Sequence, residues 1–94
     1  MGIESFRHKG LAELFRKGSS AKIGHRYAKS ALLILDHLDY AAGLEDLAGV
    51  KDFHALKGER KETYSMHVNG NYVITFGWNG RNIINVNFED YHGK

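Results

Sequence analysis

The spacing of apolar residues changes once along the chain, from a helical period in the first half to a strand period in the second. In residues 10–18, apolar side chains recur at the i, i+3, i+4 spacing of one helix face, which predicts a short helix that ends at Gly18. Its apolar positions are Leu11, Leu14 and Phe15. Residues 2–8 carry an apolar residue at every third position, and the β-forming character of Ile3 and Phe6 predicts a short strand before the helix.

A second and longer helix is predicted within residues 23–43. One stripe of its surface is apolar over about five turns, which is the pattern of an amphipathic helix. The stripe consists of Tyr27, Ala28, Ala31, Leu35, Leu38 and Ala42. Ser19 or Ser20 is expected to cap the first turn, and Gly43 is expected to end the helix in a left-handed conformation. Residues 44–50 are interpreted as a helical turn or loop.

From residue 53 onward, apolar residues alternate with polar ones, which is the period of a half-buried strand. Two Asn-Gly pairs, at 69–70 and 79–80, separate three such runs, and this dipeptide favours two-residue type I′ hairpins. The alternating apolar positions are Tyr64, Met66 and Val68, then Tyr72, Ile74, Phe76 and Trp78, then Ile84, Val86 and Phe88. With residues 52–58 as a strand leading in, the pattern predicts an antiparallel meander.

These elements predict a single α+β domain over residues 1–94, in the order β-α-α-β-β-β-β. The two N-terminal helices would cover the apolar face of an antiparallel, mixed-edge sheet and leave its other face open. The chain has no Cys and no apolar run near the roughly 18 residues that a membrane span needs. We therefore expect a cytoplasmic protein without disulfides, thiolate metal sites or a membrane partner.

The net charge of +2 conceals an uneven distribution along the chain. Residues 1–29 contain seven Lys or Arg and two Glu, giving +5, whereas residues 30–50 contain four acidic residues and no Lys or Arg, giving −4. A basic segment of this kind suits a surface that faces nucleic-acid phosphates, and Arg7 and Lys9 are its candidates for RNA contacts. A solvated helix face would have the same composition, so the charge permits nucleic-acid binding without requiring it.

Polar residues of the second half are expected to gather on the open face of the sheet. They are His54, Lys57, Arg60, Lys61, His67, Asn71, Asp90, Tyr91 and His92. Cations, imidazoles and a phenol suit RNA cleavage, because RNA carries its own 2′-hydroxyl nucleophile and needs only a base, an acid and cations at the phosphate. Such chemistry needs no metal or cofactor. The nucleophile-elbow and P-loop motifs are absent from the sequence, which excludes those routes to acyl transfer and NTP hydrolysis.

Each candidate also has a structural interpretation. His67 would ordinarily be a structural or surface residue of a strand, and the charged run 57–62 would ordinarily be a solvated loop. A metal site formed by His54 and His92 lacks any recognised ligand spacing. From the residues alone, the interpretation ends at a small α+β domain in which RNA binding is one option.

Three segments carry a resemblance to a known family. They are SFRHKGLAELFRKG at 5–18, FHALKGERKETYSMHVNGNYVITF at 53–76 and FEDYH at 88–92. Together they resemble the HigB branch of the RelE superfamily, the toxins of bacterial toxin–antitoxin modules. The resemblance covers nearly the whole chain and is weaker over 19–50, where only an amphipathic helix is shared.

The resemblance implies a fold like that of small microbial ribonucleases and an endoribonuclease activity that needs no cofactor. It implies cleavage of mRNA in the A site of the small (30S) ribosomal subunit, with a cyclic phosphate product. It also implies silencing by a HigA-type helix-turn-helix antitoxin, through which the complex would bind operator DNA.

Carried over by motif, the catalytic residues would be His54, Lys57, Asp90, Tyr91 and His92. Lys57 would stabilise the phosphorane, either histidine would act as base or acid, and Asp90 would orient a histidine. Tyr91 would stack on a base or assist proton transfer. The residues expected to contact RNA are Asn71, Arg60, Lys61, Lys9 and Arg7.

One position departs from the family pattern. Val73 stands where the resemblance implies an Arg that holds a phosphate, and loss of such a charge removes transition-state stabilisation. Lys57 or Arg60 would then have to compensate. The alternative is a catalytically weakened member that acts mainly as the antitoxin's binding partner in an operator-binding complex. An unrelated small RNA-binding domain is a more distant alternative.

Overall fold

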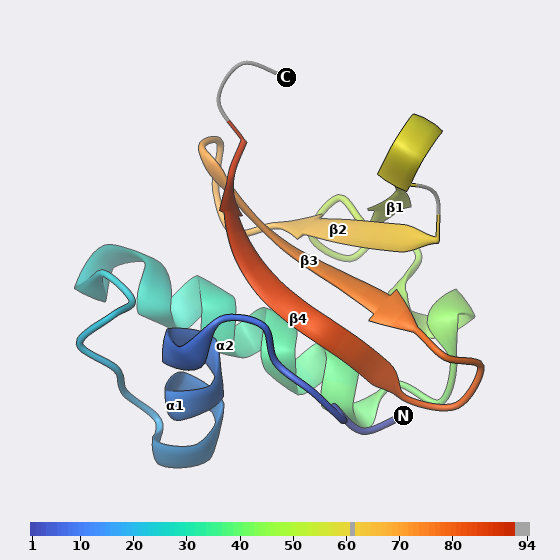
Figure 1. The fold of residues 1–94 in the computed structure, drawn as a ribbon. Helices are drawn as coiled ribbons and strands as arrows, with labels where there is room; N and C mark the ends of the chain where they lie inside the picture. Colours follow the sequence, from blue (N-terminus) through green and yellow to red (C-terminus); the bar gives the residue numbers. More distant parts are fainter. Residues whose placement is uncertain (61, 92–94) are drawn as a thin grey trace.

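A computed structural model describes residues 1–60 and 62–91. Two α-helices precede four strands that form one antiparallel sheet, in the spatial order β1-β2-β3-β4 (Figure 1). The helices are α1 (Lys9–Lys17) and α2 (His25–Tyr40), with short 3-10 helices η1 (Leu44–Leu47) and η2 (Gly58–Arg60). The strands are β1 (His54–Ala55), β2 (Thr63–His67), β3 (Tyr72–Trp78) and β4 (Ile83–Asp90). The predicted α+β fold with an antiparallel meander is confirmed.

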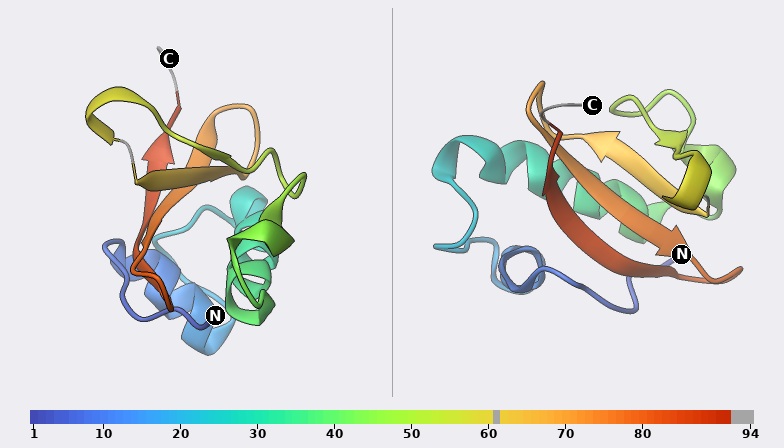
Figure 2. Two further views of the ribbon diagram at one scale, coloured as in Figure 1. Left: turned by 90° about the vertical axis from the view of Figure 1, so that its right-hand side faces the viewer. Right: turned by 45° about the horizontal axis from the view of Figure 1, so that its top comes forward.

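Both helices lie on the same side of the sheet, which the two further views also show (Figure 2). Buried apolar side chains from α1, α2, η1 and the three longer strands form one core cluster there. Fully buried members include Leu11, Leu35, Leu47, Ile74 and Val86. Among the described residues, no α-helix covers the opposite face of β2, β3 and β4.

Helix α1 ends as the sequence predicts. Gly18 has a φ of 82°, and its N–H donates to the carbonyl of Leu14 at 2.8 Å, so a glycine suits the left-handed position that terminates the helix. At the other end, His8 is the N-cap, and its Nδ1 accepts a hydrogen bond from the N–H of Leu11 at 3.3 Å.

The predicted ends of α2 were wrong. The N-cap is Gly24, whereas Ser20 accepts from the N–H of Lys22 at 3.1 Å and donates to Glu13 at 2.6 Å. Ser20 thus closes the turn between the helices instead of capping the second one. Gly43 has an extended φ of −162° and precedes η1, because the helix already ends at Tyr40.

The helix ends early because Ala41 is extended and only 8% exposed, and its carbonyl accepts a hydrogen bond from the amino group of Met1. The buried face of α2 consists of Ala31, Ile34, Leu35 and Leu38. Ile34 was missing from the predicted stripe, and Ala42, which was included, is exposed.

The two hairpin loops differ from the predicted type I′ turns. Each loop spans four residues, and the Asn side chain holds it closed, since Oδ1 of Asn69 and of Asn79 each accept two backbone N–H bonds. Among the residues of the two Asn-Gly pairs, Gly80 alone has a positive φ, at 93°. The dipeptides marked the turns correctly, but side-chain capping replaces the predicted backbone geometry.

An irregularity in β4 moves one apolar residue out of its predicted place. Asn85 has a φ of 56°, and the pairing with β3 shifts register between Thr75 and Gly77. Consequently Ile83 is buried in the core, and Ile84, which was predicted there, is only partly buried. A bulge of this kind returns the rest of β4 to regular alternation.

The predicted N-terminal strand is present only as two isolated parallel bridges. Ile3 pairs with Ile83, and Phe6 pairs with Val86, so the segment runs beside β4 without forming a regular ladder. Within the described part of the chain, no helix has the length and apolar character to cross a lipid bilayer.

Candidate functional site

Strand pairing defines which side chains share the open face of the sheet. Ser65 pairs with His54 of β1 and with Thr75 of β3, so these three residues form one cross-strand row. His67 pairs with Val73, and Val73 pairs with Glu89, so these three form the next row. Directly opposed residues point to the same side of a sheet, whereas Met66 and Ile74 between them enter the core.

A cavity of about 210 Å³ opens on this face. It is lined by Leu56, Lys57, Arg60, Ser65, Val73, Thr75, Glu89, Asp90 and Tyr91. Four of these nine were predicted site residues, namely Lys57, Arg60, Asp90 and Tyr91. The fold therefore brings the segment after β1 together with the end of β4, although Arg60 and Glu89 are 29 positions apart in the sequence.

An ion pair between Arg60 and Glu89 lines the cavity. The two terminal nitrogens of Arg60 donate to the two carboxylate oxygens of Glu89 at 2.9 and 2.7 Å. The hydroxyl of Thr75 donates to the same carboxylate at 2.5 Å. The hydrogen bond from Arg60 is the main reason that the pKa of Glu89 falls to about 2.

Glu89 was not among the predicted site residues. No local sequence signal identifies it, because Glu89 faces the cavity as the cross-strand partner of Val73, and this register is seen only in the folded sheet.

Two imidazoles lie close to Tyr91, the phenol that lines the cavity. The ring of His67 meets that of Tyr91 edge to face at 4.6 Å between centroids, and the ring of His54 lies 6.3 Å from that of His67. His54 Nδ1 is 3.0 Å from the carbonyl oxygen of Asp52. His54 and Tyr91 were predicted site residues. The ring of His67 lies between theirs, although His67 was expected to be a structural or surface residue of the strand.

His67 Nε2 is 3.5 Å from a carboxylate oxygen of Asp52, which is ion-pair distance without hydrogen-bond geometry. This nitrogen is buried and has no hydrogen-bond partner among the described residues.

Asn71 contributes through its backbone. Its carbonyl accepts a hydrogen bond from the N–H of Tyr91 at 2.6 Å, so the loop between β2 and β3 holds the end of β4 in place. The side chain of Asn71 is exposed.

Asp90 also borders the cavity and lies opposite Tyr72 in the pairing of β3 with β4, one position after Glu89. His92 and Lys61, two further predicted site residues, lie outside the described residues.

The remaining predicted RNA contacts, Arg7 and Lys9, do not line this cavity. Arg7 borders a second cavity of about 340 Å³, which also reaches Arg60, Thr75 and Glu89. Lys9 is exposed at the start of α1 and lines neither of these two cavities. The Arg60–Glu89 pair thus stands on the boundary between the two cavities.

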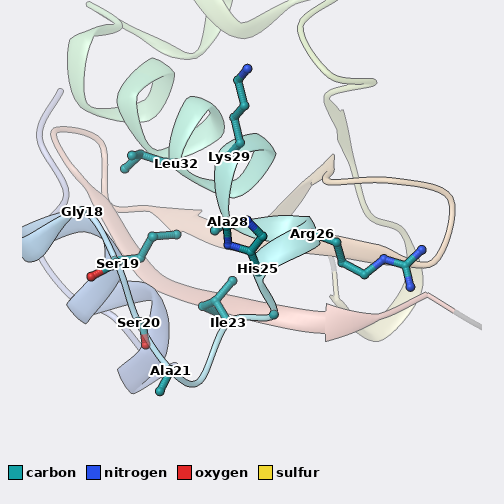
Figure 3. A pocket seen from close by; sticks show the side chains of 12 residues that line it. Gly18, Ser19, Ser20, Ala21, Ile23, His25, Arg26, Ala28, Lys29 and Leu32 are labelled. Atoms are coloured by element: carbon teal, nitrogen blue, oxygen red, sulfur yellow. The ribbon is translucent and has the colours of Figure 1, made fainter.

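A larger and shallower pocket lies on the helical side, between the α1–α2 connection and the first turns of α2 (Figure 3). Ile23, Ala28 and Leu32 provide apolar lining, and Arg26 and Lys29 extend outward from α2. It belongs to the basic N-terminal segment and contains no residue of the open face.

The open face can bind a phosphodiester and move protons. Lys57 and Arg60 supply cations, while Tyr91, His54 and His67 supply groups that exchange protons. Within residues 1–60 and 62–91, no three His, Asp or Glu side chains converge in a way that could hold a metal ion.

Comparison with known proteins identifies the family of the chain. A family model described as the RelE-like toxin HigB of type II toxin–antitoxin systems matches residues 4–92. The chain is also similar to a protein of Proteus vulgaris named Endoribonuclease HigB, with 34% identity over 91 residues, which cover 96% of this chain and 99% of the relative. The chain therefore belongs to the HigB-like family of RelE-like toxins of type II toxin–antitoxin systems.

Proposed function

We propose that this toxin is an endoribonuclease that cleaves mRNA in the ribosomal A site and so inhibits translation. The observation that carries the proposal is the convergence of Lys57, Arg60 and Tyr91 on one cavity, with His54 and His67 beside it. The name of the Proteus vulgaris relative supports the nuclease activity.

The reaction begins with removal of the proton from a ribose 2′-hydroxyl by a general base. The 2′-oxygen attacks the adjacent phosphorus, the bond to the 5′-oxygen breaks, and a general acid protonates that leaving oxygen. The products are a 2′,3′-cyclic phosphate and a free 5′-hydroxyl, so no water or metal is consumed in this step. Cations at the phosphate stabilise the additional negative charge in the transition state.

The proposed catalytic residues are His54, Lys57, Asp90, Tyr91 and His92. Lys57 stabilises the phosphorane, and a histidine serves as base or acid. Tyr91 stacks on a base or assists proton transfer. Asn71, Arg60, Lys61, Lys9 and Arg7 are the proposed RNA contacts.

The proposed partners are a HigA-type antitoxin, the 30S subunit with its mRNA, and operator DNA through the antitoxin complex. The basic segment that includes Arg26 and Lys29 would dock ribosomal RNA, because both side chains are exposed and none of the described residues that line the pocket in Figure 3 is acidic. We place the protein in the cytoplasm, where its proposed substrate is found.

The direct test is mRNA cleavage in a purified translation system. Single alanine substitutions of His54, Lys57 and Tyr91 should abolish or strongly reduce cleavage. Arg81→Ala is a matched control, since Arg81 is an exposed cation in the loop between β3 and β4 and lines neither cavity of the open face. Full cleavage by all three variants would place the active site elsewhere.

A second candidate function is favoured by Val73. This residue is 3% exposed on the cavity floor and provides no cation. A weakened enzyme that acts mainly within the antitoxin complex would show slow cleavage, together with tight antitoxin binding and operator recognition. Measuring cleavage before and after Val73→Arg separates the two, because only a weakened enzyme should gain strongly from the added guanidinium.

A further inference from the structure

We propose that Arg60 is a phosphate-binding cation that replaces the guanidinium expected at position 73, and that Glu89 positions it. The inference rests on the proposed RNA substrate. It assigns a role to Glu89, which lies near the end of β4.

The sheet register gives the first argument. Val73 and Glu89 are direct cross-strand partners, so a side chain at position 73 starts about 5 Å from that of Glu89. An Arg at position 73 would therefore lie against this carboxylate. In this chain a guanidinium reaches the same carboxylate from η2 instead. The Glu89 carboxylate can therefore hold a guanidinium that comes either from position 73 of β3 or from η2.

The second argument is that Glu89 is held independently of Arg60. Thr75, on the neighbouring strand, donates to its carboxylate at 2.5 Å, and Asn87 lies at 3.5 Å from the same oxygen. The Glu89 side chain is 25% exposed, compared with 44% for Arg60. The more buried and better anchored partner therefore orients the more exposed one.

The third argument concerns the donors of Arg60. A guanidinium has five N–H groups in a rigid plane, and the two bonds to Glu89 engage two of them. The others can be offered to a phosphate in a fixed direction. Because Arg60 and Glu89 border both cavities, a phosphate bound there would link nucleotides that lie on either side of the pair.

The variant Glu89→Gln should affect RNA affinity and kcat differently. RNA affinity should stay unchanged or improve, because the negative charge that repels the phosphate is removed. The kcat should fall by about 10-fold or more, because Arg60 is no longer held in a fixed orientation at the phosphate. A variant with weaker RNA binding and unchanged kcat would overturn the positioning role.

The phosphate-binding role is tested by moving the guanidinium. Arg60→Ala should weaken binding of a 2′-O-methyl oligoribonucleotide, which cannot be cleaved, by about 10-fold at low salt. Addition of Val73→Arg to Arg60→Ala should restore most of the binding and the cleavage rate, because the new side chain starts opposite Glu89. Addition of Val73→Leu should restore neither, and Arg81→Ala should bind like the unchanged protein.

Two results would overturn the inference. One is binding by Arg60→Ala that equals that of Arg81→Ala. The other is a folded Arg60→Ala/Val73→Arg protein, verified by circular dichroism, that remains as weak as Arg60→Ala. If the unchanged protein binds the oligonucleotide with the expected pattern but cleaves no RNA, the proposed nuclease function is wrong and the phosphate site is supported.

Discussion

The backbone N–H of Tyr91 donates a 2.6 Å hydrogen bond to the carbonyl of Asn71, which ties the end of β4 to the loop between β2 and β3. This bond places the Tyr91 ring against His67, at 4.6 Å between centroids. The position of a proposed catalytic phenol therefore depends on the geometry of a hairpin loop.

That dependence can be tested at Asn69, whose side chain accepts the N–H groups of Asn71 and Tyr72. Asn69→Ala should destabilise the protein by about 1 kcal/mol and reduce RNA cleavage, because the loop no longer holds Tyr91. Asn79→Ala removes the equivalent pair of bonds in the other hairpin loop and is the matched control. We expect similar losses of stability by urea unfolding and a loss of cleavage only for Asn69→Ala. Equal cleavage by the two variants would contradict the coupling.

The hydroxyl and the ring of Tyr91 can be separated by substitution. Tyr91→Phe keeps the edge-to-face contact with His67 but removes the group that can exchange a proton. We expect unchanged RNA affinity and a kcat that is lower by roughly 10²-fold, the contribution typical of a general acid or base. Tyr91→Leu should in addition weaken binding. An unchanged kcat for Tyr91→Phe would restrict Tyr91 to stacking.

The Arg60–Glu89 pair predicts a loss of stability in acid. The pKa of Glu89 is lowered from 4.5 to about 2, mainly by its hydrogen bond to Arg60. The unfolded chain therefore takes up a proton at a higher pH than the folded chain does. The stabilisation is complete above pH 4.5 and is lost as the pH falls toward 2.

Since both side chains are partly exposed, we expect the effect to be roughly 1–2 kcal/mol. Urea unfolding across this pH window should show a shallower pH dependence for Glu89→Gln than for the unchanged protein. Asp36→Asn, which removes an exposed carboxylate from α2, should keep the original dependence. An identical slope for Glu89→Gln would show that Glu89 is not strongly coupled to folding.

A second pH effect is expected at the start of α1. Burial, assisted by the charge of Lys22, lowers the pKa of His8 from 6.5, and the Nδ1 atom that caps Leu11 can accept a hydrogen bond only while unprotonated. The cap should therefore stabilise the protein fully above pH 6.5 and be lost as the pH falls through the lower, folded-state pKa.

His8→Ala should cost about 1 kcal/mol at neutral pH, whereas His8→Asn should retain a capping acceptor that does not titrate. Thermal unfolding measured on both sides of the transition should show the pH dependence in the unchanged protein and a smaller one in His8→Asn. If His8→Asn shows the full dependence, another group is responsible.

The sequence determined both α-helices, the four strands of the meander and their order, because the relevant signals are local. Helical spacing and Gly18 defined α1, alternation from residue 53 defined the strands, and the Asn-Gly pairs marked both hairpins. Local signals were insufficient at the ends of α2, where the core position of Ala41 and its contact with Met1 ended the helix early. They were also insufficient at Asn85, where the bulge that exchanges Ile84 for Ile83 arises from pairing with β3.

For the candidate site, too, the sequence predicted some features and only the tertiary structure showed the others. Motif resemblance pointed to Lys57, Arg60 and Tyr91, which line one cavity, and to Val73 as the departure from the family pattern. Only the tertiary structure showed that Val73 lies opposite Glu89, that Glu89 holds Arg60, and that His67 lies between His54 and Tyr91. These relationships depend on sheet register and on a contact between residues 29 positions apart, which no local pattern of side chains encodes.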